Sequence, residues 1–116
     1  MKASTIPLMA SWFGPDGKIV PRGVAQARAD VCLACPMRGP TPPMLGLAAD
    51  SIRQLLSLKA GMKLRVRGEK ALGVCLACNC VNRLKVWMEA DKIRREMSDD
   101  EFARLDPSCW IRKEGT

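Results

Sequence analysis

The chain has 116 residues and a formal net charge of +7, with six cysteines and no histidine. The lack of histidine excludes every mechanism that needs an imidazole base, including Ser-His and Cys-His nucleophile pairs. It also means that a transition-metal site here must be built mainly from thiolates. The length predicts a single domain, and the basic charge permits a phosphate-bearing partner without requiring one.

Residues 1–21 contain Pro7, a predicted turn at Gly14–Gly17 and Pro21, and they predict an extended N-terminal arm before a single metal-binding domain at 22–116. The apolar patch in this arm is short and interrupted by Pro7, which does not match a signal peptide. No apolar run approaches the ~18 residues of a membrane span. We therefore expect a cytoplasmic protein with no membrane partner, in a compartment where paired cysteines bind metal or do redox chemistry more often than they form disulfides.

A short helix is predicted at 24–30, and it leads into the first cysteine pair, Cys32 and Cys35. Pro36 follows directly and should stop the helix, because proline cannot continue its hydrogen bonding. The next segment, 38–46, has three prolines within 40–43 and predicts a stiff, extended linker.

The most regular helical pattern covers 47–60 and predicts a helix with an apolar stripe that ends near Gly61. Packing in the core is the simpler interpretation of the stripe, and a face that binds a partner is the alternative. The stripe consists of Leu47, Ile52, Leu55, Leu56 and Leu58.

Residues 62–66 alternate apolar and basic side chains, a period of two that predicts a strand with one basic face. With a turn at Gly68, this strand would form at most a short hairpin within 62–74. A further helix is predicted at 83–96, with Asn82 as its candidate cap. Ser98 and Glu101 form a capping-box pattern for a last short helix, which Pro107 should end. Together these elements predict a small α+β domain with short helices.

The cysteines repeat one motif, because "VCLAC" occurs at 31–35 and again at 74–78. A Cys-x-x-Cys turn directs both sulfurs to one point, so two such knuckles supply four thiolates to one tetrahedral ion. Sites made only of cysteine select zinc or, alternatively, an iron–sulfur cluster. The segment between the knuckles, 39–73, is then an insertion that carries the linker and the long helix. The predicted metal ligands are Cys32, Cys35, Cys75 and Cys78.

Cys80 and Cys109 leave three arrangements open. In the favoured one they are thiols beside a four-cysteine site; in the others they replace knuckle cysteines as ligands, or all six thiolates hold two metals. Disulfides are a weaker alternative, with 15 connectivities for six cysteines. Because Cys80 lies two residues after Cys78, a turn at Asn79 is needed for both to face one ion. Cys109 has to fold back from the tail, beside Trp110.

The order of these residues resembles small cysteine-rich proteins encoded by tailed phages and prophages. The resemblance covers about 28–36 and 74–112, with Asn79 where the family usually has glycine. It implies a metal-binding fold, a phage or prophage origin, and a place in the host cytoplasm or in the virion. The matching residues are Cys32, Cys35, Pro36, Cys75, Cys78, Cys80, Lys85, Cys109 and Trp110.

The function that these features favour is a non-catalytic protein with a structural zinc site, which acts through another protein as an interaction module or a minor virion component. An iron–sulfur protein is one alternative, although the chain lacks the closely spaced cysteine run of ferredoxins. An enzyme is not expected, because a centre closed by four thiolates has no position for a substrate.

A nucleic-acid-binding zinc protein is the other alternative. Basic side chains would contact phosphates, but the basic stretch 59–70 has no aromatic residue to stack on a base. A run of charge is also common on any solvated face. The candidate contacts are Lys63, Arg65, Arg67, Lys70, Arg83 and Lys85.

Overall fold

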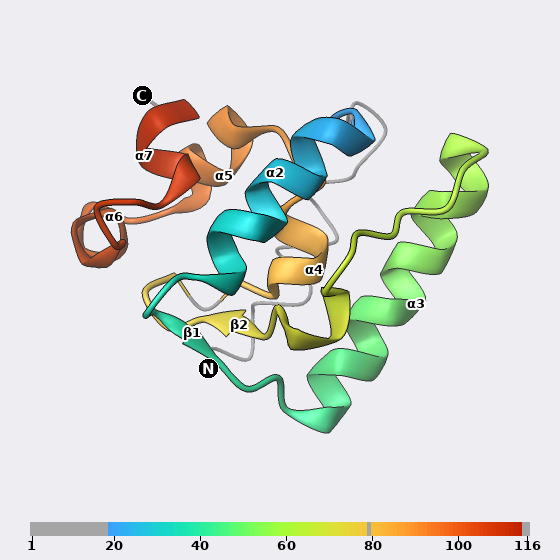
Figure 1. Cartoon of the computed structure of the whole chain (residues 1–116), viewed down its shortest axis with the longest axis horizontal. Helices are drawn as coiled ribbons and strands as arrows, with labels where there is room; N and C mark the ends of the chain where they lie inside the picture. The colour runs from blue at the N-terminus through green and yellow to red at the C-terminus, as the bar shows by residue number, and fades with distance from the viewer. Residues whose placement is uncertain (1–18, 79, 115–116) are drawn as a thin grey trace.

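The computed structural model describes residues 19–78 and 80–114, which form α-helices and a small antiparallel sheet and confirm the α+β class (Figure 1). Most of the expected arm at 1–21, with its turn at Gly14–Gly17, lies outside the described residues, as does Asn79. The elements are α2 (Arg22–Leu33), β1 (Arg38–Gly39), α3 (Pro43–Ala60), a 3₁₀ helix (Glu69–Ala71), β2 (Val74–Cys75), α4 (Asn82–Lys85), α5 (Ala90–Glu96), α6 (Asp99–Arg104) and α7 (Trp110–Glu114).

Helix α4 lies at the centre and packs against both α2 and α3, while α5 packs against α7. Figure 1 shows α2 crossing in front of α4, and α3 along one edge of the molecule. The largest fully buried side chains lie in and around α4, with Leu84 and Trp87 among them. The core therefore surrounds the short helix that follows the second cysteine knuckle. No helix in the described part is long and apolar enough to cross a membrane.

Helix α2 is longer than the predicted 24–30 and includes Cys32 in its last turn. Its buried side chains include Ala25, Ala29 and Cys32, whose spacing of four and three residues places them on one face. The small alanines allow α2 to pack closely on the core, so the core itself fixes the position of the first knuckle.

Helix α3 confirms the long helix, although it begins earlier than expected, within the predicted linker. Pro43 occupies its first turn, where the missing N–H costs nothing. Gly61 ends it in the left-handed conformation with φ of 69°, as the sequence predicts. The predicted apolar stripe divides between two faces: Leu56 is buried and Ile52 is partly buried, while the three other leucines of the stripe are exposed.

The strand predicted at 62–66 is wrong, because the chain forms no strand at 62–68, and the hairpin given as the most that 62–74 could form is absent there. Leu64 and Val66 are buried there, while the basic residues between and beside them are exposed. The alternating side chains therefore face the core and the solvent in turn, as in a strand, but the backbone pairs with no neighbouring strand. The sheet forms elsewhere: β1 pairs antiparallel with β2, with Arg38 opposite Cys75. The paired residues Arg38 and Cys75 are 37 positions apart in the sequence, and local periodicity carries no signal for such a distant pairing.

The single helix expected at 83–96 is also wrong, because the chain turns at 86–89 between α4 and α5. Val86, Trp87 and Met88 are all buried, and three consecutive buried residues do not fit one face of a surface helix. Met88 pairs instead with Ile19 in an isolated β-bridge. Asn82 does not cap α4; it is the first residue of the helix, and its side chain donates to the Leu72 carbonyl.

The capping box before α6 is confirmed. The Ser98 hydroxyl accepts from the Glu101 backbone N–H, and the Glu101 carboxylate accepts from the Ser98 backbone N–H. After Pro107 the tail forms α7, an element that the sequence pattern did not predict. Its Trp110 and Ile111 are buried, so the tail is part of the core.

Candidate metal centre

The first knuckle forms where α2 ends. The backbone N–H of Cys35 donates to the Cys32 carbonyl at 3.1 Å, and that of Arg38 donates to the Cys35 carbonyl at 3.2 Å. Burial raises the pKa of the Cys35 thiol, and the hydrogen bond that its sulfur accepts from the Met37 backbone N–H opposes this in part. Backbone N–H groups directed at a sulfur favour the thiolate, as expected for a knuckle.

The second knuckle begins on β2. The Cys75 backbone N–H donates to the Cys80 carbonyl at 2.9 Å, and Val74 forms a β-bridge with Val81, so these bonds close the loop that contains Cys78. The Cys78 backbone N–H donates to the Cys75 sulfur. The two "VCLAC" copies therefore differ in setting, since the first ends a helix and the second begins at a strand.

The small sheet brings the two knuckles together. Besides the pairing of Arg38 with Cys75, the Leu76 N–H donates to the Met37 carbonyl at 2.8 Å. This close approach requires glycine: a Cβ on Gly73, whose φ is 60°, would lie 1.9 Å from the Gly39 carbonyl oxygen. The backbone of each knuckle therefore contacts the other directly.

Cys109 joins the same region from the tail. Its N–H donates to the Asp106 carbonyl at 2.9 Å, immediately before α7. The indole Nε1 of the adjacent Trp110 donates to the Cys32 sulfur at 3.4 Å. The tail therefore folds back onto the first knuckle, and Trp110 makes the contact.

The six cysteines form two groups that share Cys75: one lines a small cavity, and the other consists of Cys75, Cys78 and Cys80, which are linked by thiol hydrogen bonds. Four of them line a cavity of about 10 Å³, room for about one water-sized sphere. Cys78 and Cys80 lie outside this lining, and the Cys80 sulfur is 3.7 Å from the Cys78 carbonyl. All six are free thiols. The four cysteines in the lining are Cys32, Cys35, Cys75 and Cys109.

Lys85 is enclosed by these sulfurs. Its side chain is 1 % exposed, its Nζ lies 3.6 Å from the Cys78 sulfur, and it is 5.5 Å from the centre of the Trp110 ring. Burial lowers the pKa of Lys85, but the negative charges that Cys78 and Cys75 carry as thiolates outweigh burial and raise the pKa above its usual value. No carboxylate among the described residues pairs with this ammonium.

The thiols themselves are hard to ionise in these surroundings. Burial raises the pKa of Cys32, although the Trp110 N–H and the Lys85 charge oppose it. The pKa of Cys78 is lowered by a hydrogen bond from Cys75, but its bond to Cys80 and its burial raise it to about 12. A cation bound to the sulfurs would stabilise their thiolate forms.

The described residues contain no group of three or more cysteine or acidic side chains placed so that it could hold a metal ion. The sulfurs of Cys75, Cys78 and Cys80 hydrogen-bond to one another instead. Metal binding requires cysteine to lose its proton, which would remove these thiol–thiol bonds. The donor set fits a thiophilic metal: it consists of soft sulfur, N–H groups directed at sulfur, and a buried cation that compensates negative charge.

The structure separates the residues proposed to contact nucleic acid. Lys85 is buried among cysteines and does not reach the surface. Arg83 is mostly buried and forms an ion pair with Asp50 at 2.9 Å. The remaining four are exposed in the segment between α3 and β2: Lys63, Arg65, Arg67 and Lys70.

Two side chains of the centre have no role in the sequence-based prediction of a metal site. Trp110 and Lys85 belong to the pattern that resembles the phage proteins, but Lys85 is otherwise predicted only as a phosphate contact. The signal for Lys85 was its place between Leu84 and Val86 in an apolar segment, where a solvent-directed side chain is difficult to accommodate.

Comparison of the chain with protein-family models, with curated proteins and with solved structures finds no match. The function of the centre is therefore inferred from its own residues.

Proposed function

We propose that this chain is a non-catalytic protein whose fold is stapled by a metal bound to cysteine thiolates, with zinc as the metal. The observation that carries the proposal is the buried ammonium of Lys85, which sulfurs surround and no described carboxylate pairs. An unpaired buried charge is very costly, and neutral thiols do not compensate it. A zinc ion held by four thiolates keeps a net negative charge, and Lys85 would balance part of it.

The ligand set that the cavity favours is Cys32, Cys35, Cys75 and Cys109. It differs from the sequence-based set in one position, with Cys109 in place of Cys78. Cys78 then lies beside the centre and contacts Lys85. In a centre of this kind the metal supplies cross-linking, and the closed thiolate set leaves no position for a substrate.

The biological setting rests on the order of the cysteines. Their resemblance to small proteins of tailed phages supports a phage or prophage origin and a role as an interaction module or minor virion component. Zinc is preferred to an iron–sulfur cluster because the chain lacks the compact cysteine run of ferredoxins. In either case the metal would connect three separate parts of the chain: the end of α2, the start of β2 and the segment before α7.

The test is the metal content of the anaerobically purified protein and of its six single Cys→Ser variants. We expect a colourless wild-type protein with about one zinc ion per chain. The variants Cys32→Ser, Cys35→Ser, Cys75→Ser and Cys109→Ser should lose zinc, while Cys78→Ser and Cys80→Ser should retain it.

Each other pattern points to a different conclusion. If Cys78→Ser loses zinc and Cys109→Ser retains it, the ligands are those predicted from the sequence, with Cys78 as the fourth. Loss in all six variants, with two zinc ions in the wild type, would favour the two-metal arrangement. A coloured protein that contains iron would mean that the cysteines hold an iron–sulfur cluster and not zinc. A wild-type protein that is folded without any metal would contradict the proposal.

A further inference from the structure

Helix α3 carries an apolar stripe that nothing in the described residues covers. Its side chains are strongly exposed: Met44 at 83 %, Leu47 at 71 %, Leu55 at 68 % and Leu58 at 81 %. Large apolar side chains gathered on one exposed face are a common mark of an interaction site. Helix α3 lies at the edge of the molecule (Figure 1), and the exposure of these side chains places the stripe on its solvent-facing side.

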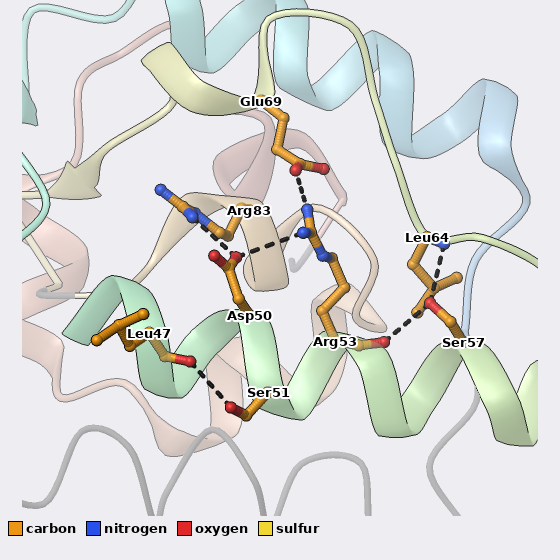
Figure 2. Close-up of polar contacts among 8 residues, drawn as sticks. All are labelled: Leu47, Asp50, Ser51, Arg53, Ser57, Leu64, Glu69 and Arg83. Atoms are coloured by element: carbon orange, nitrogen blue, oxygen red, sulfur yellow. Dashed lines mark hydrogen bonds and ion pairs between the residues drawn. The ribbon is translucent and has the colours of Figure 1, made fainter. Parts of the chain in front are cut away.

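The opposite face of α3 is fixed to the protein. Arg53 forms an ion pair with Glu69, and Asp50 forms one with Arg83 at 2.9 Å (Figure 2). Figure 2 shows Asp50 and Arg53 reaching from one side of the helix and Ser51 lying on the other. The exposed stripe therefore cannot turn inward without breaking both ion pairs.

The stripe is symmetric about Ser51. Leu47 and Leu55 lie four residues before and after it, and Met44 and Leu58 lie seven residues before and after it. Residues four and seven apart share one face of a helix. If a second α3 lies antiparallel with Ser51 opposite Ser51, each Leu47 meets Leu55 of the other copy and each Met44 meets Leu58. An isologous two-fold contact requires such self-complementarity.

The chemistry of the stripe suits such a pairing. Ser51 is small and allows close approach at the centre, and its hydroxyl donates to the Leu47 carbonyl at 3.1 Å, so no polar group is left unsatisfied. None of the five side chains is charged, so two chains of net charge +7 can meet here without burying like charges. Exposed side chains of this size supply on the order of 500 Å² per copy, a large part of the ~800 Å² of a standard interface.

We infer that α3 is a homodimerisation helix, and that two copies of this chain pair antiparallel through Met44, Leu47, Ser51, Leu55 and Leu58. None of these five residues lines the cysteine cavity, so the contact does not use the residues of the metal centre. Because the interface is a single helix pair, its dissociation constant should be roughly micromolar, about 1–100 μM.

The first experiment is sedimentation equilibrium of the metal-loaded full chain between about 1 and 300 μM. A reducing agent excludes intermolecular disulfides. We expect a reversible monomer–dimer equilibrium. In Ser51→Glu the two new carboxylates face each other at the two-fold axis, so the dissociation constant should rise at least about tenfold. Ala27→Glu, which adds the same charge at an exposed position of α2, is the matched control and should not change it.

A charge pair tests the antiparallel orientation. Leu47→Glu and Leu55→Lys should each weaken the dimer, whereas the double variant Leu47→Glu/Leu55→Lys should recover affinity, because an antiparallel pair places opposite charges together. A parallel pair would place like charges together and would not recover. Unchanged metal content and melting temperature show that each variant is folded, since all the changed positions are exposed.

Three results would overturn the inference. They are a monomer at every concentration, stripe variants that associate like the wild type, and a double variant as weak as the single ones. A wild-type monomer would leave the stripe to a different protein or to another segment of this chain, and the homodimer would be wrong.

Discussion

Lys85 occupies a position that lysine rarely takes in proteins. The residue is 1 % exposed, and its ammonium lies among sulfurs with the Trp110 ring beside it. Groups that neutralise and orient metal ligands often matter nearly as much as the ligands themselves. The centre therefore includes residues that a search restricted to cysteine would omit.

Replacing Lys85 by leucine should weaken zinc binding about 10- to 100-fold, the usual effect of removing a group that supports metal ligands. Leucine keeps the site apolar but leaves the negative charge of the thiolates without compensation. Competition with a chromophoric zinc chelator measures the affinity. Lys63→Leu, at an exposed position, is the matched control. Equal affinities for the two variants would show that Lys85 only fills space.

At the residue scale the sequence predicts that cysteines are the metal ligands, but it does not predict which cysteines share one site. The repeated knuckles identify the cysteines because their spacing is a local property of the chain. Which sulfurs share one cavity depends on how the 109–114 tail folds back, and the sequence contains no local signal for that contact. That Cys109 lines the cavity and Cys78 does not can therefore be learned only from the structure.

Two elements of the fold depend on glycines with positive φ, and they differ in what surrounds each glycine. Gly61 ends α3 in open space, whereas Gly73 lies against the carbonyl of Gly39 at the junction of the knuckles. The same substitution therefore separates the backbone cost from the cost of a steric clash.

Gly61→Ala should lower the free energy of unfolding by about 1 kcal/mol, the cost of left-handed backbone for alanine. Gly73→Ala should lower it by about 3 kcal/mol or more and reduce metal retention, because the added Cβ would lie 1.9 Å from a carbonyl oxygen and push the knuckles apart. Chemical denaturation monitored by circular dichroism gives both values. Equal losses would mean that the contact between knuckles is not required.

At the element scale the predictions succeed where local chemistry decides and fail where tertiary contacts do. The Gly61 stop of α3 and the Ser98 cap of α6 are local signals, and both are confirmed. The helix expected at 83–96 breaks because the 86–89 turn is buried in the core and hydrogen-bonds to distant segments. One such bond runs from the guanidinium of Arg28 on α2 to the Met88 carbonyl at 2.6 Å.

The whole molecule is held by contacts between distant parts of a chain with few large aromatic residues. Arg28 stacks on Trp110 with 4.2 Å between the guanidinium carbon and the ring centre, and it forms an ion pair with Glu114 at 2.7 Å. These contacts join α2 to α7, and both helices contribute residues to the lining of the cysteine cavity. The proposed metal would thus reinforce a connection that the core makes only through a few side chains.

Removing the metal should therefore abolish cooperative unfolding rather than merely lower the melting temperature. Binding free energy becomes folding free energy when the ligands come from separate segments, and a structural zinc site supplies on the order of 10 kcal/mol. That exceeds or matches the whole stability of a typical small domain, about 5–15 kcal/mol. The measurement is thermal unfolding by circular dichroism after treatment with a strong chelator under reducing conditions. Zinc added back in excess should restore the transition, which separates metal loss from oxidation of the thiols. A cooperative transition at the original temperature, in protein shown to be free of metal, would mean that the packing around α4 is sufficient on its own.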